Sequence, residues 1–303
     1  MTGLGAPQGL SNIGEEAKPP FTVLPDPSTL FLNRSRRLRA IAPGHILESY
    51  LKFVADVTEA QHAIQAELPE AALPAESQIE QALEHGMAPL SRSSLTPGDQ
   101  EELTLRRLLE SLRQKEMLQD AAAAIGSLAA ASSKKLSQVL NGALKDLPTD
   151  NIAGRVLAVA ALQVHFSRLA AKFNGEELQP VADGTCPVCG SAPLTSAVVG
   201  WPAAHNIRFC SCSLSGTLWH VVRIKCTLCG STEGIGYQSI EGRPETVKAE
   251  TCDRCGQYVK ILYQVKDPAL DPLSDDIGSL DLDILLAKEG WRRGGQNLFL
   301  LGY

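Results

Sequence analysis

The chain has 303 residues, of which 44% are hydrophobic, 20% charged and only 5% aromatic, and its formal net charge is −6. These values are ordinary for a globular protein of two or three domains, and because no apolar run reaches about 18 residues, no transmembrane helix is expected. Residues 1–18 lack the basic and apolar regions of a secretory signal peptide, so we expect a cytoplasmic protein without membrane insertion.

Residues 21–178 are predicted to form an all-α helical domain, preceded by a disordered N-terminus over residues 1–20. Between residues 45 and 68 the apolar side chains recur every three or four positions, which is the period of a helix with one buried face. Thr96-Pro97 has the pattern of an N-cap and a first helical proline, and Thr149-Asp150-Asn151 caps a last, strongly apolar helix. The histidines of this region stand alone and are expected to be packed or surface residues rather than ligands: His62, His85 and His165.

Four arginines are concentrated in residues 31–39, at the start of this helical region. We expect them to lie on the solvated face of a helix, and the alternative is a docking patch for an acidic partner. A twin-arginine export signal is not expected, because no long apolar region follows.

The pattern changes after Pro180 to short β-type runs, and then to a spacer and a short helix over residues 275–285. The predicted fold class is therefore multi-domain, an all-α domain followed by two small β modules and a C-terminal helix. Aromatic residues in the tail, Phe299 and Tyr303, are expected either to pack back on the helices or to contact a partner. The predicted boundaries are 1–20 for the disordered N-terminus, 21–178 for the helical domain, 179–223 and 224–267 for the two modules, and 268–303 for the C-terminal helix and tail.

All eight cysteines lie in the two modules, and their spacing forms an internal repeat. A shift of 40 residues superimposes the Cys-x-x-Cys pair of the first module on that of the second and also aligns the glycine and serine that follow each pair. Two such pairs about 15–20 residues apart are typical of a zinc ribbon, because two tight turns then bring four sulfurs around one point. The predicted metal ligands are Cys186, Cys189, Cys210 and Cys212 in the first module, and Cys226, Cys229, Cys252 and Cys255 in the second.

The first module departs from the repeat, because Ser215 stands where the second module has Cys255. Cys210 is favoured as the replacement ligand, since residues i and i+2 of a strand face the same side. The alternatives are a three-sulfur site with an open position and a site that binds metal poorly. Disulfides are a further alternative for all eight cysteines, but they are disfavoured in a cytosolic protein.

Several segments resemble the FdhE family of formate dehydrogenase accessory proteins. They are Cys186-Pro-Val-Cys189-Gly190-Ser191 and residues 219–226, 248–252 and 258–263, with further similarity in residues 31–39, in the helix from His45 and in residues 275–299. The resemblance implies two rubredoxin-like modules with iron as the native metal, and a cytoplasmic role on the catalytic subunit of a molybdenum or tungsten formate dehydrogenase before export. In the family the second turn of the first module reads Cys-Ser-Leu-Cys, whereas here it is Cys212-Ser213-Leu214-Ser215.

The predicted function is that of a chaperone-like assembly factor, not an enzyme, that binds the immature catalytic subunit through a scaffold stabilised by up to two iron or zinc ions. The alternative is a rubredoxin-like iron redox protein, in which the irregular first site is the labile one. Nucleic-acid binding is disfavoured, because residues 183–267 hold eight basic and seven acidic residues and each M(Cys)₄ site would add about −2. No phosphate loop, His-Glu-x-x-His motif or nucleophile elbow occurs in the sequence.

Overall fold

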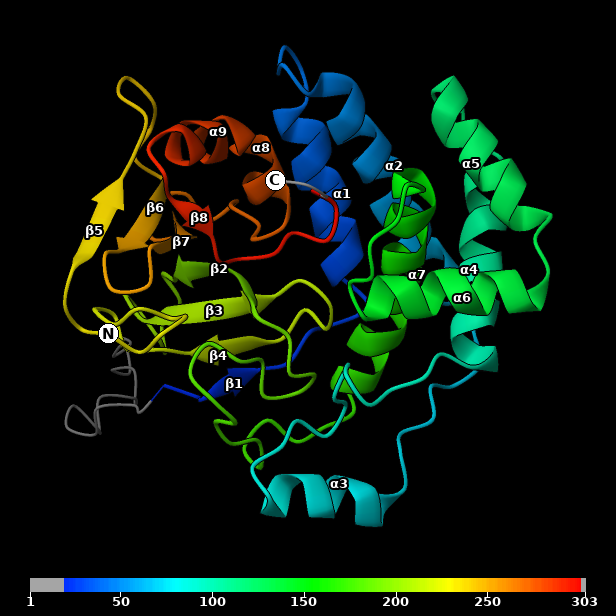
Figure 1. The fold of residues 1–303 in the computed structure, drawn as a ribbon, viewed down its shortest axis with the longest axis horizontal. Helices are drawn as coiled ribbons and strands as arrows, with labels where there is room; N and C mark the ends of the chain where they lie inside the picture. Colours follow the sequence, from blue (N-terminus) through cyan, green and yellow to red (C-terminus); the bar gives the residue numbers. More distant parts are fainter. Residues whose placement is uncertain (1–18, 301–303) are drawn as a thin grey trace, which may run out of the picture.

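The structure is a computed structural model and describes residues 19–300. The expectation of disorder for residues 1–18 and the one for Tyr303 lie outside the described residues. Figure 1 shows a helical region on one side of the molecule and a sheet on the other, with α3 standing apart from both. The helices of the N-terminal region are α1 (Leu30–Ile41), α2 (Glu48–Ile64), α3 (Glu76–Glu84), α4 (Asp99–Leu112), α5 (Gln119–Ala129), α6 (Ser133–Leu144) and α7 (Ile152–Ala170).

A single mixed sheet follows the helices and contains both copies of the repeat. Its order is β1-β4-β3-β2-β7-β6-β5, and β8 pairs with β7. The first copy forms the antiparallel unit β2-β3-β4 and the second forms β5-β6-β7, and the two units join where β2 runs parallel to β7. The strands are β1 (Thr22–Val23), β2 (Pro193–Val198), β3 (Arg208–Cys212), β4 (Leu218–His220), β5 (Ile235–Gln238), β6 (Val247–Cys252), β7 (Gln257–Tyr263) and β8 (Arg292–Arg293).

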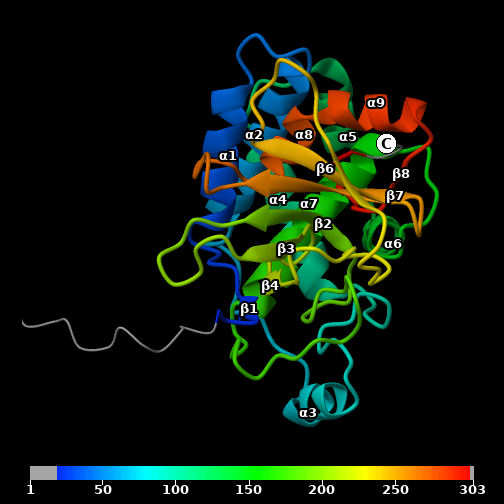
Figure 2. The same ribbon diagram turned by 90° about the vertical axis from the view of Figure 1, so that its left-hand side faces the viewer.

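Two short C-terminal helices, α8 (Ser274–Gly278) and α9 (Leu280–Lys288), cover one face of the second unit. Figure 2 shows the strands stacked from β1 to β6, with α8 and α9 beside β6 and β7. The Lys260 side chain is buried under these helices and makes ion pairs with Asp276 (3.3 Å) and Asp283 (2.5 Å). Arg293 contacts the same two carboxylates, so the buried charges balance and fasten the helices to β7.

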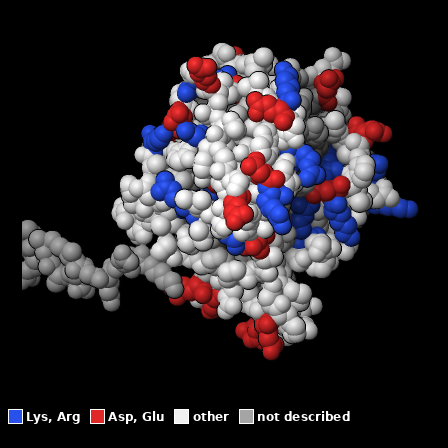
Figure 3. Space-filling view, turned by 60° about the vertical axis from the view of Figure 1, so that its left-hand side comes forward, with Lys and Arg blue, Asp and Glu red and all other residues white. Residues whose placement is uncertain are grey.

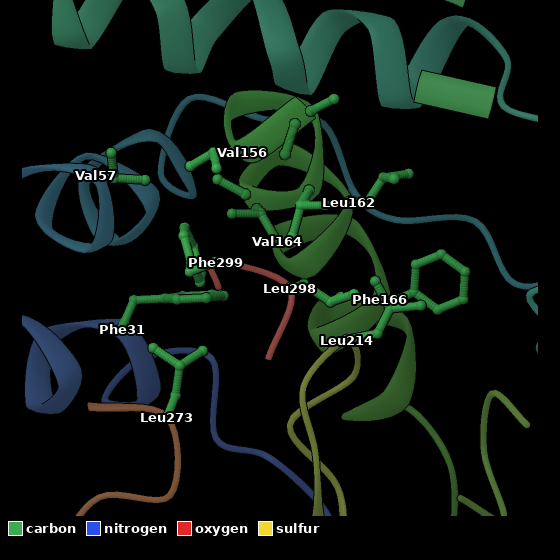
Figure 4. Packing of buried hydrophobic residues seen from close by; sticks show 14 of the residues in the cluster. Phe31, Val57, Val156, Leu162, Val164, Phe166, Leu214, Leu273, Leu298 and Phe299 are labelled. Carbon is green, nitrogen blue, oxygen red and sulfur yellow. The ribbon is translucent and has the colours of Figure 1, made fainter. Parts of the chain in front are cut away.

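One hydrophobic core runs through the helical region, the first sheet unit and the tail. Phe31 of α1 and Leu273 meet Leu298 and Phe299 of the tail beside α7, and Leu214 of the first unit packs at the same site (Figure 4). The C-terminal segment therefore completes the core of the N-terminal helices, as one of the two expectations for Phe299 proposed.

α7 is the central helix of this core. By length and composition it is apolar enough to cross a membrane, but 83% of its most apolar window is buried in the protein, which is typical of a core helix. The Asn151 side chain caps it as predicted, accepting a hydrogen bond from the Gly154 N–H at 2.9 Å.

Three details differ from the predicted elements. Gly98, and not Thr96, is the N-cap of α4, because the Glu101 carboxylate accepts the Gly98 N–H at 2.9 Å and sets the start two residues later. The β-type run over residues 218–224 is a strand only as far as His220, and Val222 and Ile224 are exposed. The apolar spacing of the C-terminal helix predicts one inward face, formed by Ile277, Leu280, Ile284 and Leu285. Ile277 and Leu280 are buried as predicted, whereas Ile284 and Leu285 are exposed.

The arginine run of α1 is only partly a solvated face, because Arg36 and Arg39 are exposed whereas Arg34 is only 4% exposed. Arg37 donates two hydrogen bonds from Nε and Nη2 to the Asp275 carboxylate of α8, at 2.9 and 2.6 Å. The acidic group that Arg37 meets therefore belongs to the same chain, and the pairing joins the two ends of the sequence.

Candidate metal centres

The four cysteines of the second copy converge at one point. The sulfur atoms of Cys226, Cys229, Cys252 and Cys255 all lie within 4.8 Å of one another. The Sγ atoms are 3.9 Å apart in the pair Cys226–Cys255 and 3.7 Å apart in the pair Cys229–Cys252. Four thiolates at about 2.3 Å from one tetrahedral ion are ~3.8 Å apart, so the group has the spacing of a metal site. All eight cysteines are free thiols, so the disulfide alternative is not supported.

The turns of the repeat explain this convergence. In each first turn the glycine N–H returns to the first cysteine carbonyl, Gly190 to Cys186 at 2.9 Å and Gly230 to Cys226 at 3.0 Å. Both glycines have a φ near +70°, at 72° and 74°, a conformation that a side chain disfavours. Each Cys-x-x-Cys segment is thus held in a tight bend that turns both sulfurs to one side.

The first copy brings together three cysteines, Cys186, Cys189 and Cys212. The Sγ atoms of Cys189 and Cys212 are 3.4 Å apart, and the Ser215 Oγ lies 3.6 Å from the Cys186 Sγ. Ser215 thus lies beside Cys186 as Cys255 lies beside Cys226. The Ser215 Oγ also donates a hydrogen bond to the Thr217 Oγ1, at 2.9 Å.

Burial and hydrogen bonding act in opposite directions on the pKa values of the first group. Burial raises the pKa of Cys186 well above its usual range, and that of Cys189 to about 12. Burial also opposes ionisation of Cys212, but hydrogen bonds from Cys186, Cys189 and Ser215 hold the pKa of that thiol well below its usual range. Because thiolates and not thiols bind metal, uptake of an ion here must release protons and must weaken as the pH falls.

Cys210, the favoured fourth ligand in the sequence, is not in this group. It faces the same side of β3 as Cys212, but two residues of a strand are about 6.6 Å apart along its axis, which exceeds the spacing of ligands around one ion. Its buried thiol lies beside Arg208 and Thr227, and burial raises its pKa to about 12. The i, i+2 spacing thus correctly predicted that Cys210 and Cys212 lie on the same side of the strand. It did not predict that their sulfur atoms are too far apart to bind one ion.

Replacing Cys210 therefore tests the first group. Cys210→Ala is expected to leave the metal content of the purified protein unchanged, because the three gathered thiols remain. The matched variant Cys212→Ala removes one of them and is expected to lower the content by about one ion per chain. Elemental analysis of both proteins measures this, and a loss of metal in Cys210→Ala would show that Cys210 is a ligand.

The histidines do not join either group of the described chain. His165 pairs with Glu101 at 3.0 Å, inside the helical core. His220 packs its ring against Phe209 with the centroids 5.9 Å apart. His165 is therefore packed, as expected for an isolated histidine, and His220 is a half-buried residue of β4.

Sequence reasoning missed a buried ion pair next to the centres. Arg208 on β3 donates two hydrogen bonds to Glu250 on β6, both at 2.8 Å, and Arg208 also contacts the carbonyls of Arg223 and Lys225. The pair crosses from one sheet unit to the other and holds the linker between them. The only signal in the sequence is that Glu250 occupies the repeat position of Cys210.

Three family models match consecutive parts of the chain. They are "FdhE, N-terminal" over residues 19–183, "FdhE, central domain" over residues 185–223 and "FdhE, C-terminal domain" over residues 224–300. The chain belongs to the FdhE family. The boundaries between the matched FdhE models coincide with two boundaries of the structure. The first is the change from helices to sheet, and the second is the linker between the two sheet units.

Named relatives agree with this membership. A protein FdhE homolog of Rhizobium meliloti (strain 1021) is 38% identical over 296 residues, 97% of each chain. The FdhE protein of Salmonella dublin is 34% identical over 285 residues, 93% of this chain and 91% of its own. The crystal structure of the FdhE protein from Pseudomonas aeruginosa matches with a TM-score of 0.83 at 30% identity and covers 93% of this chain and 99% of that chain. The helical region followed by a small mixed sheet is thus the fold that this FdhE protein shares.

Proposed function

We propose that the protein is a cytoplasmic accessory factor for formate dehydrogenase, which binds the immature catalytic subunit and has no catalytic activity of its own. Membership of the FdhE family supports the link to formate dehydrogenase. The observation that carries the scaffold part of the proposal is the convergence of Cys226, Cys229, Cys252 and Cys255. Such a group suits a structural role better than catalysis, because all four thiolates would bind the ion.

The two cysteine groups would act as rubredoxin-like or zinc-ribbon modules, each with iron or zinc. The soft sulfur donors suit both metals, and a bound ion would cross-link the two turns of each unit. Cross-linking matters because the second unit has a small core of its own, formed by Ala249, Tyr258, Leu282 and Leu286. Units of this size rarely fold without such a link.

In the first group, Ser215 would take the fourth corner, with its hydroxyl a weak ligand beside three thiolates. Its 3.6 Å distance from the Cys186 Sγ supports this role. The Ser215→Cys variant is then expected to bind zinc or iron more tightly at the first group, because a thiolate replaces a hydroxyl at a soft site. Competition with a chelator measures the change, and an unchanged affinity in the variant would argue that this corner does not reach the ion.

The alternative function is that of an iron redox protein. The solvent exposure of Cys229 favours it, because an electron-transfer partner could approach the second group closely. It requires a reversible Fe(III)/Fe(II) couple in protein prepared without oxygen. Full support of formate dehydrogenase by a zinc-only preparation would exclude it.

The surface charge on the face shown in Figure 3 does not favour a nucleic acid as the partner. On the face in Figure 3, lysines and arginines are interspersed with acidic side chains and do not form one continuous basic field. Binding to a phosphate backbone needs such a field.

A pull-down from cells respiring formate tests the proposed function. The tagged protein is expected to retain the catalytic subunit of formate dehydrogenase, and elemental analysis of the same sample is expected to find iron or zinc. A chain-specific control is the Arg254→Ala variant, which alters an exposed residue of the second turn without removing a sulfur. Recovery of no dehydrogenase subunit under these conditions would contradict the proposal.

A further inference from the structure

The two cysteine groups differ sharply in their exposure to solvent. Cys186, Cys189, Cys212 and Ser215 are each 0–1% exposed. In the second group Cys229 is exposed and Cys255 half-buried. The difference extends to the residues between the ligands: Ser213 and Leu214 are buried, whereas Asp253 and Arg254, at the matching positions of the repeat, are exposed.

The helical region is what covers the first group. The Leu90 N–H donates to the Val188 carbonyl at 2.9 Å, and the Arg92 N–H donates to the Cys189 carbonyl at 3.0 Å. On the other turn, the Gln163 side chain of α7 donates to the Ser213 carbonyl at 2.6 Å. Both turns of the first group are thus hydrogen-bonded to the helical domain, and Leu214 enters its core (Figure 4).

Within residues 19–300, the helical domain does not cover the second group in this way. Its unit forms the far side of the sheet, away from helices α4 to α7 (Figure 1). Contacts to its turns come from the tail, where Arg292 donates to the Cys255 carbonyl at 3.1 Å and Leu228 packs against Gly294. Gly184 also lies against the Thr227 carbonyl. These contacts hold the backbone of the turns but leave the Cys229 sulfur open to solvent.

We propose that the second group is the exchangeable, thiol-reactive centre of the protein, with Cys229 as its point of attack, and that the first group is inert. This inference rests on the proposed metal-binding function. It also reverses the expectation from the sequence, in which the irregular first group was the labile one. The missing cysteine matters less than burial, because a reagent or competing ligand must first reach a sulfur atom.

The chemistry at Cys229 is simple substitution. A competing thiolate or chelator takes the coordination position that the Cys229 sulfur leaves, and that sulfur takes up a proton. With iodoacetamide the Cys229 sulfur forms a bond to the acetamide carbon and iodide leaves. Neither step needs an oxidant, and both require an approach that the structure leaves open at Cys229 and closes at Cys189, the matching position of the first group.

The test is timed alkylation of the zinc-loaded, full-length protein with iodoacetamide, with each cysteine followed by peptide mapping. Cys229 is expected to react at least about tenfold faster than Cys186, Cys189 or Cys212, because the buried group must first open locally. In parallel, excess chelator is expected to remove the zinc of the second group first, and prior zinc removal should accelerate alkylation of Cys226 and Cys252.

Matched variants separate the two groups. Cys229→Ser is expected to remove the fast-labelled position and to lower the zinc content by about one ion per chain, whereas Cys189→Ser is expected to leave the fast labelling of Cys229 in place. Equal labelling rates across the two groups of the zinc-loaded wild type, or faster labelling of the first group, would overturn the inference and leave the proposed function standing. A wild-type protein that takes up no zinc or iron would overturn the metal-binding function and this inference together.

Discussion

In protein that carries Cys252→Ser, the second sheet unit is expected to unfold and support of formate dehydrogenase to be lost. Cys252 is 1% exposed and ends β6 between Ile235 of β5 and Gln257 of β7. Structural zinc contributes about 10–16 kcal/mol of apparent free energy in small modules, and the core of this unit is too small to replace that contribution. Hydrogen exchange should show lost protection in β5 and β6, and elemental analysis should show about one ion fewer per chain.

The control for this prediction is Arg254→Ala, which changes an exposed residue of the same turn and keeps all four sulfurs. It is expected to keep wild-type protection and metal content. If Cys252→Ser also kept both, and still supported formate dehydrogenase activity, the assignment of a structural metal to the second group would be wrong.

Loss of the Arg208 side chain is expected to lower the free energy of unfolding by about 3–5 kcal/mol, because it leaves the buried Glu250 without its counter-charge. The side chain of Arg208 is 0% exposed and that of Glu250 is 3% exposed, and two hydrogen bonds of 2.8 Å join them. The Arg208→Ala variant also frees the carbonyls of Arg223 and Lys225 in the linker. Urea unfolding followed by circular dichroism measures the change.

A second pair of variants isolates the charge. Arg208→Lys keeps the positive charge but loses the bidentate hydrogen bonds to Glu250. Its free energy of unfolding is expected to lie between those of the wild type and Arg208→Ala. Arg208→Leu combined with Glu250→Leu removes both charges and is expected to recover much of the lost stability. If the double variant were as unstable as Arg208→Ala, the loss would come from packing and not from the unpaired carboxylate.

Local patterns predicted the helices, the two-module order and seven of the eight cysteines in the gathered groups. Their causes lie within a few residues of each other, as in the Asn151 cap or the positive φ of Gly190 and Gly230. Such local signals can be recognised in the sequence without knowing how the rest of the chain folds.

Contacts between distant segments were not predictable in this way. The pairing of Arg37 with Asp275 spans 238 residues, and that of Arg208 with Glu250 spans 42. The parallel pairing of β2 with β7 joins the two sheet units, and nothing in the periodicity of either strand encodes it. The sequence alone predicted that Arg37 is solvated, because a single sequence does not show which carboxylate lies next to it in the fold.

The packing of Leu298, Phe299 and Leu300 in the same core as Phe31 and the α7 residues has a consequence for biosynthesis. While the ribosome is still translating, the helices have already emerged but lack the side chains that close them. They remain open until residues 298–300 have emerged, so final compaction of the helical core must wait for the whole sheet region to be synthesised. A nascent helical domain of this kind is exposed to cellular folding factors during that interval.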